Sequence, residues 1–178
     1  MTLLQTELVY PAGASLCAVA GSAFDVKSRR VPNFVTGTGF LLGLSIHLAL
    51  GGWSQLLTSF AGGLICGLVF LVFYLAGGMG AGDVKLIAAV GAIAGLSQIA
   101  YLLVLTAIAG GVMAIGLALI RGRLRETVMN VAVLATHHSQ EGLRPHPDLN
   151  VTNVQTLRLP YALAIAAGSL LTLYFQVV

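Results

Sequence analysis

The sequence has 178 residues, of which 57% are hydrophobic and 8% are charged, and its formal net charge is +3. A soluble domain usually carries about 25% charged residues, so this composition excludes an ordinary water-soluble enzyme and favours a chain that is solvated by lipid. We therefore expect one all-α domain over residues 1–178, folded as a polytopic bundle of membrane helices.

Six apolar segments predict six transmembrane helices, because a helix needs about 20 apolar residues to cross the hydrocarbon core. In chain order, these segments cover residues 8–24, 34–50, 56–76, 84–96, 99–120 and 160–177. The fourth segment is shorter than a full crossing. Its start is therefore expected to be recessed into the membrane.

The connection between the fifth and sixth segments, residues 121–159, is the only long one. Apolar residues recur in it at helical spacing and predict an amphipathic helix on the membrane surface; they are Leu124, Val128, Val131 and Ala135. His137, His138 and His146 also lie in this connection, but their spacing matches no standard metal site. No metal or cofactor is expected.

The basic residues indicate how the bundle is oriented. Every Lys and Arg falls on the same side of the predicted membrane, in the connections that carry Lys27, Arg29, Arg30, Lys85, Arg121, Arg123, Arg125, Arg144 and Arg158. The positive-inside rule makes this side cytosolic, so both termini face outward. Since topology accounts for the positive charge, no nucleic-acid partner is expected.

Two carboxylates, Asp25 and Asp83, lie at the ends of apolar segments. An ionisable group at membrane depth costs about 2.5–3.5 kcal/mol on insertion scales and usually serves a function. Asp25 ends the first segment and Asp83 opens the fourth, so both are predicted at the same depth near the cytosolic face. Alternatively, Asp25 neutralises a neighbouring cation and Asp83 is the N-cap of its helix.

A glycine-rich stretch precedes Asp83, with the sequence Gly77-Gly78-Met79-Gly80-Ala81-Gly82. Glycine permits positive φ angles and close backbone approach, so an extended substrate could lie against this loop. Irregular backbone at membrane depth is tolerated where it is buried or lines a wet cavity. The stretch therefore predicts a water-accessible pocket that contains Asp83.

Two motifs resemble a known family. Gly80-Ala81-Gly82-Asp83 is similar to the G-x-G-D signature of intramembrane aspartyl peptidases. The stretch from Asp25 to Asn33, an Asp followed by basic residues and Pro32-Asn33, resembles the other half of the type IV prepilin peptidase pattern. Residues 159–166 resemble the last span of that family, so the resemblance extends over essentially the whole chain.

The resemblance implies an aspartic endopeptidase of the bacterial inner membrane that removes the basic leader of prepilins or pseudopilins at the cytosolic face. It implies Asp25 and Asp83 as catalytic residues. The residues expected to bind substrate or shape the site are Gly80, Gly82, Lys85, Pro32 and Asn33. Many family members carry an N-terminal methyltransferase region with a C-x-x-C zinc site. This sequence lacks that motif and resembles the short, peptidase-only members of Flp pilus systems, so methyltransferase activity is not expected.

The predicted chemistry needs two carboxyl groups that share one proton, and the sequence does not assign the acid and the base. Lys85 either contacts an acidic group of the substrate, tunes the aspartate pair or anchors its helix at the membrane surface. Pro32 and Asn33 are expected to set the turn into the second helix, with Asn33 as its cap.

Two other functions are alternatives to this interpretation. A protease of the presenilin or signal-peptide-peptidase type is disfavoured by the basic Asp25 connection and the small size. The other candidate is a membrane transporter or assembly scaffold that uses Asp25 and Asp83 as an ion or proton relay. The absence of repeats and of further intramembrane charges weighs against it.

Overall fold

The computed structural model describes residues 3–147, 149 and 160–178. These residues contain six α-helices, one short 3-10 helix and no strand, which confirms the all-α prediction for this part of the chain. The helices are α1 (Leu3–Ser28), α2 (Asn33–Leu75), α3 (Ala81–Ala94), η1 (Leu96–Gln98), α4 (Ile99–Ile120), α5 (Leu124–Glu141) and α6 (Tyr161–Val177).

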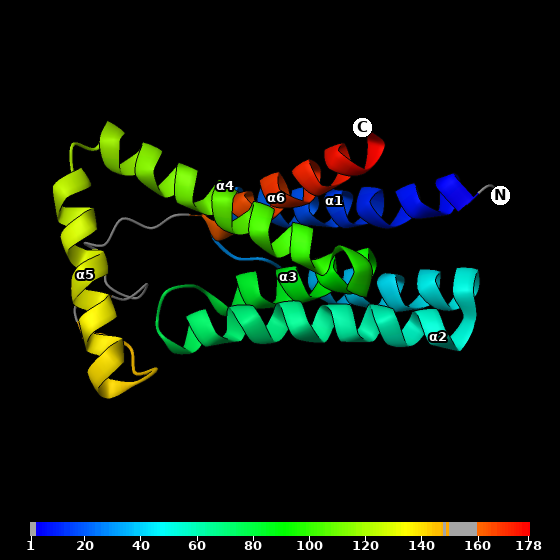
Figure 1. Ribbon diagram of the computed structural model, residues 1–178, viewed down its shortest axis with the longest axis horizontal. Helices are drawn as coiled ribbons and strands as arrows, with labels where there is room; N and C mark the ends of the chain where they lie inside the picture. Colours follow the sequence, from blue (N-terminus) through cyan, green and yellow to red (C-terminus); the bar gives the residue numbers. More distant parts are fainter. Residues whose placement is uncertain (1–2, 148, 150–159) are drawn as a thin grey trace.

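Helix α2 is a helical hairpin of 43 residues. Its backbone leaves the helical conformation at Gly52, which has φ 67° and ψ −160°, a combination open essentially to glycine alone. Figure 1 shows α2 doubling back at one end of the molecule, so that two antiparallel arms run side by side. The two predicted apolar segments at 34–50 and 56–76 lie in these two arms.

Helix α3 is the central helix of the bundle. It has only 14 residues, and nearly all of those from Leu86 to Ala94 are buried, as expected for a helix that is apolar on every side. Its most extensive packing is with α2, and α1 also lies against it, while α6 packs on α1 and α4 (Figure 1). Asp83 is therefore carried by the element that contacts most of the bundle.

Glycines line the contact between α2 and α3. A methyl group on Gly43 would lie 2.8 Å from the backbone of Ala92, and one on Gly63 would lie 2.8 Å from the Ala88 carbonyl oxygen. Such small residues let helix backbones approach closely in lipid. The close approach brings α3 into the groove between the arms of α2.

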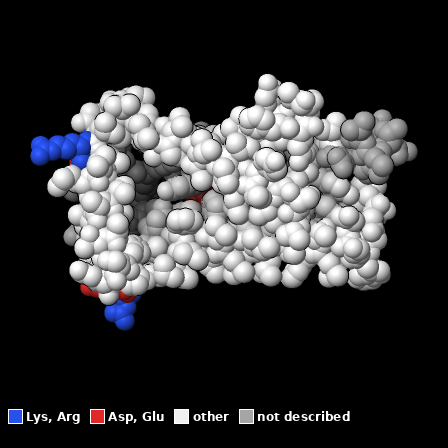
Figure 2. Space-filling model, in the orientation of Figure 1, with Lys and Arg blue, Asp and Glu red and all other residues white. Residues whose placement is uncertain are grey.

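The outer surface of the bundle is apolar. Three helices are long and apolar enough to cross a membrane, namely Leu8–Ser28, Asn33–Leu75 and Leu96–Ile120, and Tyr161–Val177 is apolar but shorter. Large apolar side chains such as Leu41, Leu57 and Val112 are mostly exposed. In the view of Figure 2 the face of the bundle is nearly free of charged side chains. The length and the apolar composition of these helices identify the chain as a membrane protein.

Helix α5 lies across one end of the bundle, roughly perpendicular to its neighbours (Figure 1). Its range confirms the helix predicted within 121–159, and none of its described side chains is buried. Residues 148 and 150–159 of that connection, which include Arg158 and Leu159, lie outside the described residues. Figure 2 shows a hollow between α5 and the bundle, with an acidic side chain visible inside it.

Candidate active site

Asp25 lies in the last turn of α1, which continues to Ser28 and so is longer than the predicted segment 8–24. The carbonyl oxygen of Asp25 accepts a hydrogen bond from the Arg29 N–H over 2.7 Å. Arg29 has a left-handed backbone conformation with φ 52°, the geometry that commonly ends a helix. The chain therefore turns sharply at Arg29 and enters α2 four residues later, at Asn33.

Asp83 is the third residue of α3. It is not the N-cap that the alternative interpretation supposed: Gly80 occupies that position, and the Gly80 N–H donates to Asp83 Oδ2 over 3.3 Å. A carboxylate in this position satisfies an unpaired N–H of the first turn and faces the positive end of the helix dipole. The preceding loop turns at Gly77, whose φ is +77°.

Both carboxylates line one pocket with a volume of about 490 Å³. The pocket is lined by Asp25, Arg29, Arg30, Val31, Pro32, Asn33, Gly80, Ala81, Gly82, Asp83 and Lys85. The structure thus brings together every residue that the sequence singled out for the site. It adds Arg29, Arg30, Val31 and Ala81, which are sequence neighbours of those residues.

The surroundings of Asp83 favour its protonated form. Asp83 lies just before the fourth predicted span, which begins at Val84. Burial of its carboxyl group raises the pKa of Asp83 to about 6. The negative charge of Asp25 raises this pKa further, whereas hydrogen bonds from the backbone N–H groups of Gly80 and Ala162 lower it. The two carboxyl groups are therefore close enough to influence each other, as sharing of one proton requires.

Ala162 is a contact that the sequence analysis missed. It lies in the first turn of α6, where backbone N–H groups have no partner within the helix and can bind a carboxylate. Pro160 is the N-cap of this helix, and Pro is typical of helix starts. The predicted topology, in which the segment 160–177 starts on the same side of the membrane as Asp83, is the signal that could have pointed to this contact.

The predicted cap role of Asn33 is wrong. Pro32 is the N-cap of α2 and no side chain caps the helix; Asn33 is its first residue, and its Oδ1 accepts a hydrogen bond from Lys85 Nζ over 3.0 Å. An Asn near a helix start predicts a local cap. In the folded chain, however, the Asn33 side chain binds the charged amine of Lys85, which is 52 residues away in the sequence.

The histidines lie apart from the pocket lining. His47 is buried and stacks on Tyr10 at a centroid distance of 4.0 Å, and its Nε2 is 3.0 Å from the Ile93 carbonyl oxygen, which indicates a structural role. His137 and His138 belong to α5, and the His137 ring contacts His146. Among the described residues, no group of three His, Cys, Asp or Glu side chains is arranged to hold a metal ion.

Comparison with known proteins gives one match. The model of a family described as the type IV leader peptidase family matches residues 12–115, a range that contains both Asp25 and Asp83. No curated protein and no solved structure gives a significant match to the chain.

Proposed function

The chain belongs to the type IV leader peptidase family, and from this premise we propose that Asp25 and Asp83 are the catalytic pair of an aspartic endopeptidase. One observation carries the proposal: both carboxyl groups line the same pocket, and the charge of Asp25 raises the pKa of Asp83. The proposed substrates are prepilin-like precursors, of the Flp type or pseudopilins, whose basic leader is removed at the cytosolic face.

In the proposed mechanism the pair holds a single proton. The ionised carboxylate takes a proton from water while the water oxygen attacks the scissile carbonyl carbon, and the protonated carboxyl donates a hydrogen bond to the developing oxyanion. The tetrahedral intermediate then collapses: the C–N bond breaks, and a proton passes from the carboxyl pair to the leaving nitrogen. Because burial and the charge of Asp25 raise the pKa of Asp83 to about 6, we assign the shared proton to Asp83 at rest.

The substrate is proposed to enter from the end of the bundle that faces α5. Gly80 and Gly82 lie along the pocket and have no side chain that would keep a peptide backbone away. In this proposal the six predicted apolar segments, which lie in α1, the two arms of α2, α3, α4 and α6, cross the bacterial inner membrane, and Asp83 lies just before the fourth of them. The pocket then opens at its cytosolic face, and α5 lies on the membrane surface.

The test uses the purified protein in lipid with a prepilin that carries an intact leader. Asp25→Asn and Asp83→Asn keep the side-chain shape but remove the ionisable carboxyl group, so each is expected to lower the cleavage rate at least about a hundredfold. Glu141→Gln, a matched change at the exposed end of α5, should leave the rate unchanged.

Cleavage at the wild-type rate by both Asp→Asn variants contradicts the peptidase mechanism. A wild-type protein that cleaves none of several cognate pilins instead favours the non-enzymatic alternative, in which the two carboxylates form an ion or proton relay in a transporter or scaffold.

A further inference from the structure

One hydrogen bond between two side chains joins segments that are far apart in the sequence. Lys85 Nζ donates to Asn33 Oδ1 over 3.0 Å, across 52 residues. The other side-chain pairs that are hydrogen-bonded within the described ranges, Thr58 with Gln55 and Arg123 with Glu126, are three residues apart. The Lys85–Asn33 bond is therefore a tertiary tie rather than a local helix contact.

This bond connects the two segments that carry the carboxylates. Asn33 begins α2 and is joined by a four-residue connection to the last turn of α1, which contains Asp25. Lys85 lies two residues after Asp83, near the start of α3. All four residues line the same pocket, so the bond crosses the site where the separation of the two carboxyl groups is set.

The α1–α2 connection at the mouth of the pocket is also held by Val31, which packs against the core, and by the edge-to-face contact of Phe24 with Phe34, whereas its two arginines are exposed. Deeper in the bundle, α1 and α3 are fixed because Gly21 leaves room for Leu86. At the mouth, residues 29–32 are exposed or half-buried, and Arg29 keeps a left-handed conformation that costs a non-glycine residue about 1–2 kcal/mol. A strained and exposed connection relaxes unless something tethers it. Besides its packing on the core, Val31 lies close to Gly82 of the α3 segment.

We propose that Lys85 and Asn33 are positioning residues, whose hydrogen bond holds the Asp25 connection against the start of α3 and so fixes the separation of the two carboxyl groups. The inference rests on the catalytic role proposed above for Asp25 and Asp83. The catalytic activity of two carboxyl groups that share one proton depends on the distance between them. A displacement of one group by about 1 Å can lower the rate about a hundredfold.

The surroundings of Lys85 favour positioning over direct charge tuning. The Lys85 amine donates its hydrogen bond to the neutral amide of Asn33, although Asp83 is only two residues away in the sequence. Within the described part of the chain the single ion pair is that of Arg123 with Glu126, so neither aspartate forms one with Lys85. The Lys85 side chain is also exposed, where water screens its charge.

The chain contains a matched control for Lys85. Asp25-Val26-Lys27 repeats the order of Asp83-Val84-Lys85, so Lys27 has the same spacing from a carboxylate and carries the same charge. Lys27 does not line the pocket. Replacing each lysine by methionine therefore removes the same charge at the same spacing, but only Lys85→Met breaks the bond to Asn33.

The kinetic test measures cleavage of a prepilin by the full chain in lipid. Lys85→Met and Asn33→Ala are each expected to lower kcat between about tenfold and a hundredfold with little change in KM. The double variant should be no slower than the slower single one, because both changes break the same bond. Lys85→Arg, which keeps a donor, should recover most of the rate, and Lys27→Met should keep it.

The pH profile separates positioning from charge. When the carboxyls move apart, Asp83 holds its proton less tightly, so the alkaline loss of activity should shift to lower pH in Asn33→Ala, although this variant changes no charge. A wild-type rate for Asn33→Ala, an additive double variant, or an equal loss in Lys27→Met overturns the proposal.

A second measurement does not depend on cleavage. With Cys17 and Cys66 replaced by Ala, nitroxide labels at Val26→Cys and Ala81→Cys report the distance between the two segments by electron paramagnetic resonance. Asn33→Ala and Lys85→Met should broaden or lengthen that distance, whereas Lys27→Met should not. An unchanged distance in both overturns the positioning role. Absence of wild-type cleavage would instead count against the proposed peptidase function and leave this readout valid.

Discussion

At the scale of single residues, Asp83 is subject to two opposing influences. The first turn of α3 supplies the N–H of Gly80, and the first turn of α6 supplies that of Ala162; both stabilise the ionised carboxylate. Burial and the charge of Asp25 act in the other direction and prevail, so that the pKa is raised to about 6. The backbone thus orients the carboxylate while its surroundings favour protonation, which suits a group that must exchange a proton near neutral pH.

This balance predicts a pH-dependent stability that Asp83→Asn removes. Because the pKa is about 6 in the folded protein and 3.8 is the ordinary value, the folded chain binds the proton more tightly than the unfolded chain does. The wild-type free energy of unfolding should therefore be greatest below about pH 4 and fall as the pH rises through about 6. At about pH 8 the variant should be the more stable by roughly 1–3 kcal/mol.

Thermal unfolding of both proteins in the same detergent across this pH range measures the effect. Glu141→Gln, an exposed carboxylate on α5, is the control and should unfold in parallel with wild type. Parallel curves for Asp83→Asn and wild type across the whole range would contradict the raised pKa.

At the scale of elements, the reversal of α2 depends on one glycine. Gly52 has a positive φ that other residues rarely adopt, yet a methyl group added there would have no neighbour within 4 Å. Gly37, in the first arm of α2, has equally open surroundings but helical backbone geometry. The two positions differ in backbone conformation and not in available space.

Alanine substitution at these positions should have opposite effects. Gly52→Ala is expected to destabilise the fold by about 1–3 kcal/mol because the turn becomes strained. Gly37→Ala should be neutral or stabilise it by up to about 1 kcal/mol, since alanine favours the helix. Melting temperatures in detergent compare the two variants, and an equal change in both would show that the turn does not require glycine.

Helix α3 shows what periodicity predicts well and where it is less accurate. The apolar stretch was predicted at 84–96, and the helix is Ala81–Ala94. The helix begins three residues earlier than predicted, within the glycine motif, because Gly80 is its N-cap and the Gly80 N–H is bound by the Asp83 carboxylate. The helix ends at Ala94 and is followed by Gly95, which has φ 75° and where a methyl group would lie 2.7 Å from the ring of His47.

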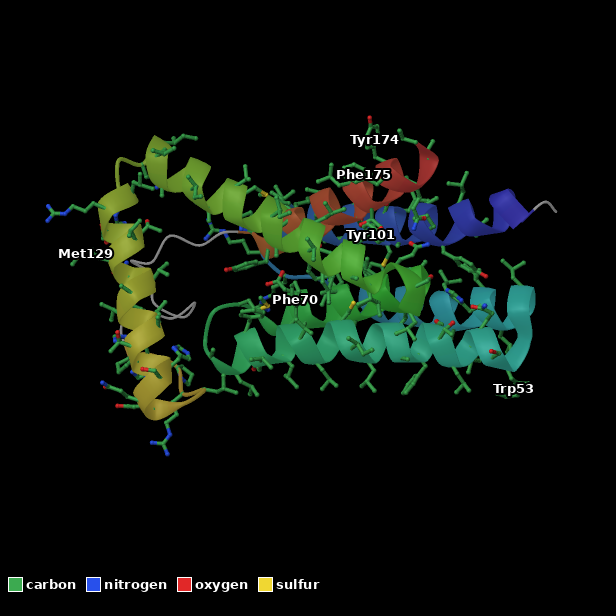
Figure 3. The ribbon with its side chains drawn as sticks, viewed as in Figure 1. Trp53, Phe70, Tyr101, Met129, Tyr174 and Phe175 are labelled. Atoms are coloured by element: carbon green, nitrogen blue, oxygen red, sulfur yellow. The ribbon has the colours of Figure 1, made fainter. Side chains whose placement is uncertain are left out.

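At the scale of the whole molecule, polar and aromatic groups are separated along the bundle. The charges visible in Figure 2 gather at the α5 end. Figure 3 shows Trp53, Tyr174 and Phe175 in the half of the bundle away from α5, and all three are exposed. Aromatic residues of this kind favour the membrane interface, and basic residues favour the cytosolic side.

This distribution predicts the topology. A green fluorescent protein inserted after Arg144 should fluoresce, because that connection is expected in the cytosol, whereas alkaline phosphatase should be active when inserted at Gly52 or fused to the C-terminus. Protease accessibility in intact spheroplasts is the independent check. A fluorescent C-terminal fusion would reverse the orientation and place the pocket on the outer face.

The sequence by itself determined the class of the fold, the membrane environment and the family, because these depend on composition, period and short motifs that act locally. It also paired Asp25 with Asp83 through the parity of the spans. What it could not determine were contacts between distant segments: the role of Asn33 was predicted wrongly, and the Ala162 N–H beside Asp83 was not anticipated.

Only the tertiary structure decided those contacts, because they arise from how α1, α2, α3 and α6 pack rather than from neighbours along the chain. The glycines of α2 and α3 set the approach of the helices, and this approach determines which side chain reaches which. The two aspartates were identifiable in the sequence because a carboxylate in an apolar chain is costly anywhere. Their shared pocket, the raised pKa of Asp83 and the bond that joins their segments exist only once the bundle has closed.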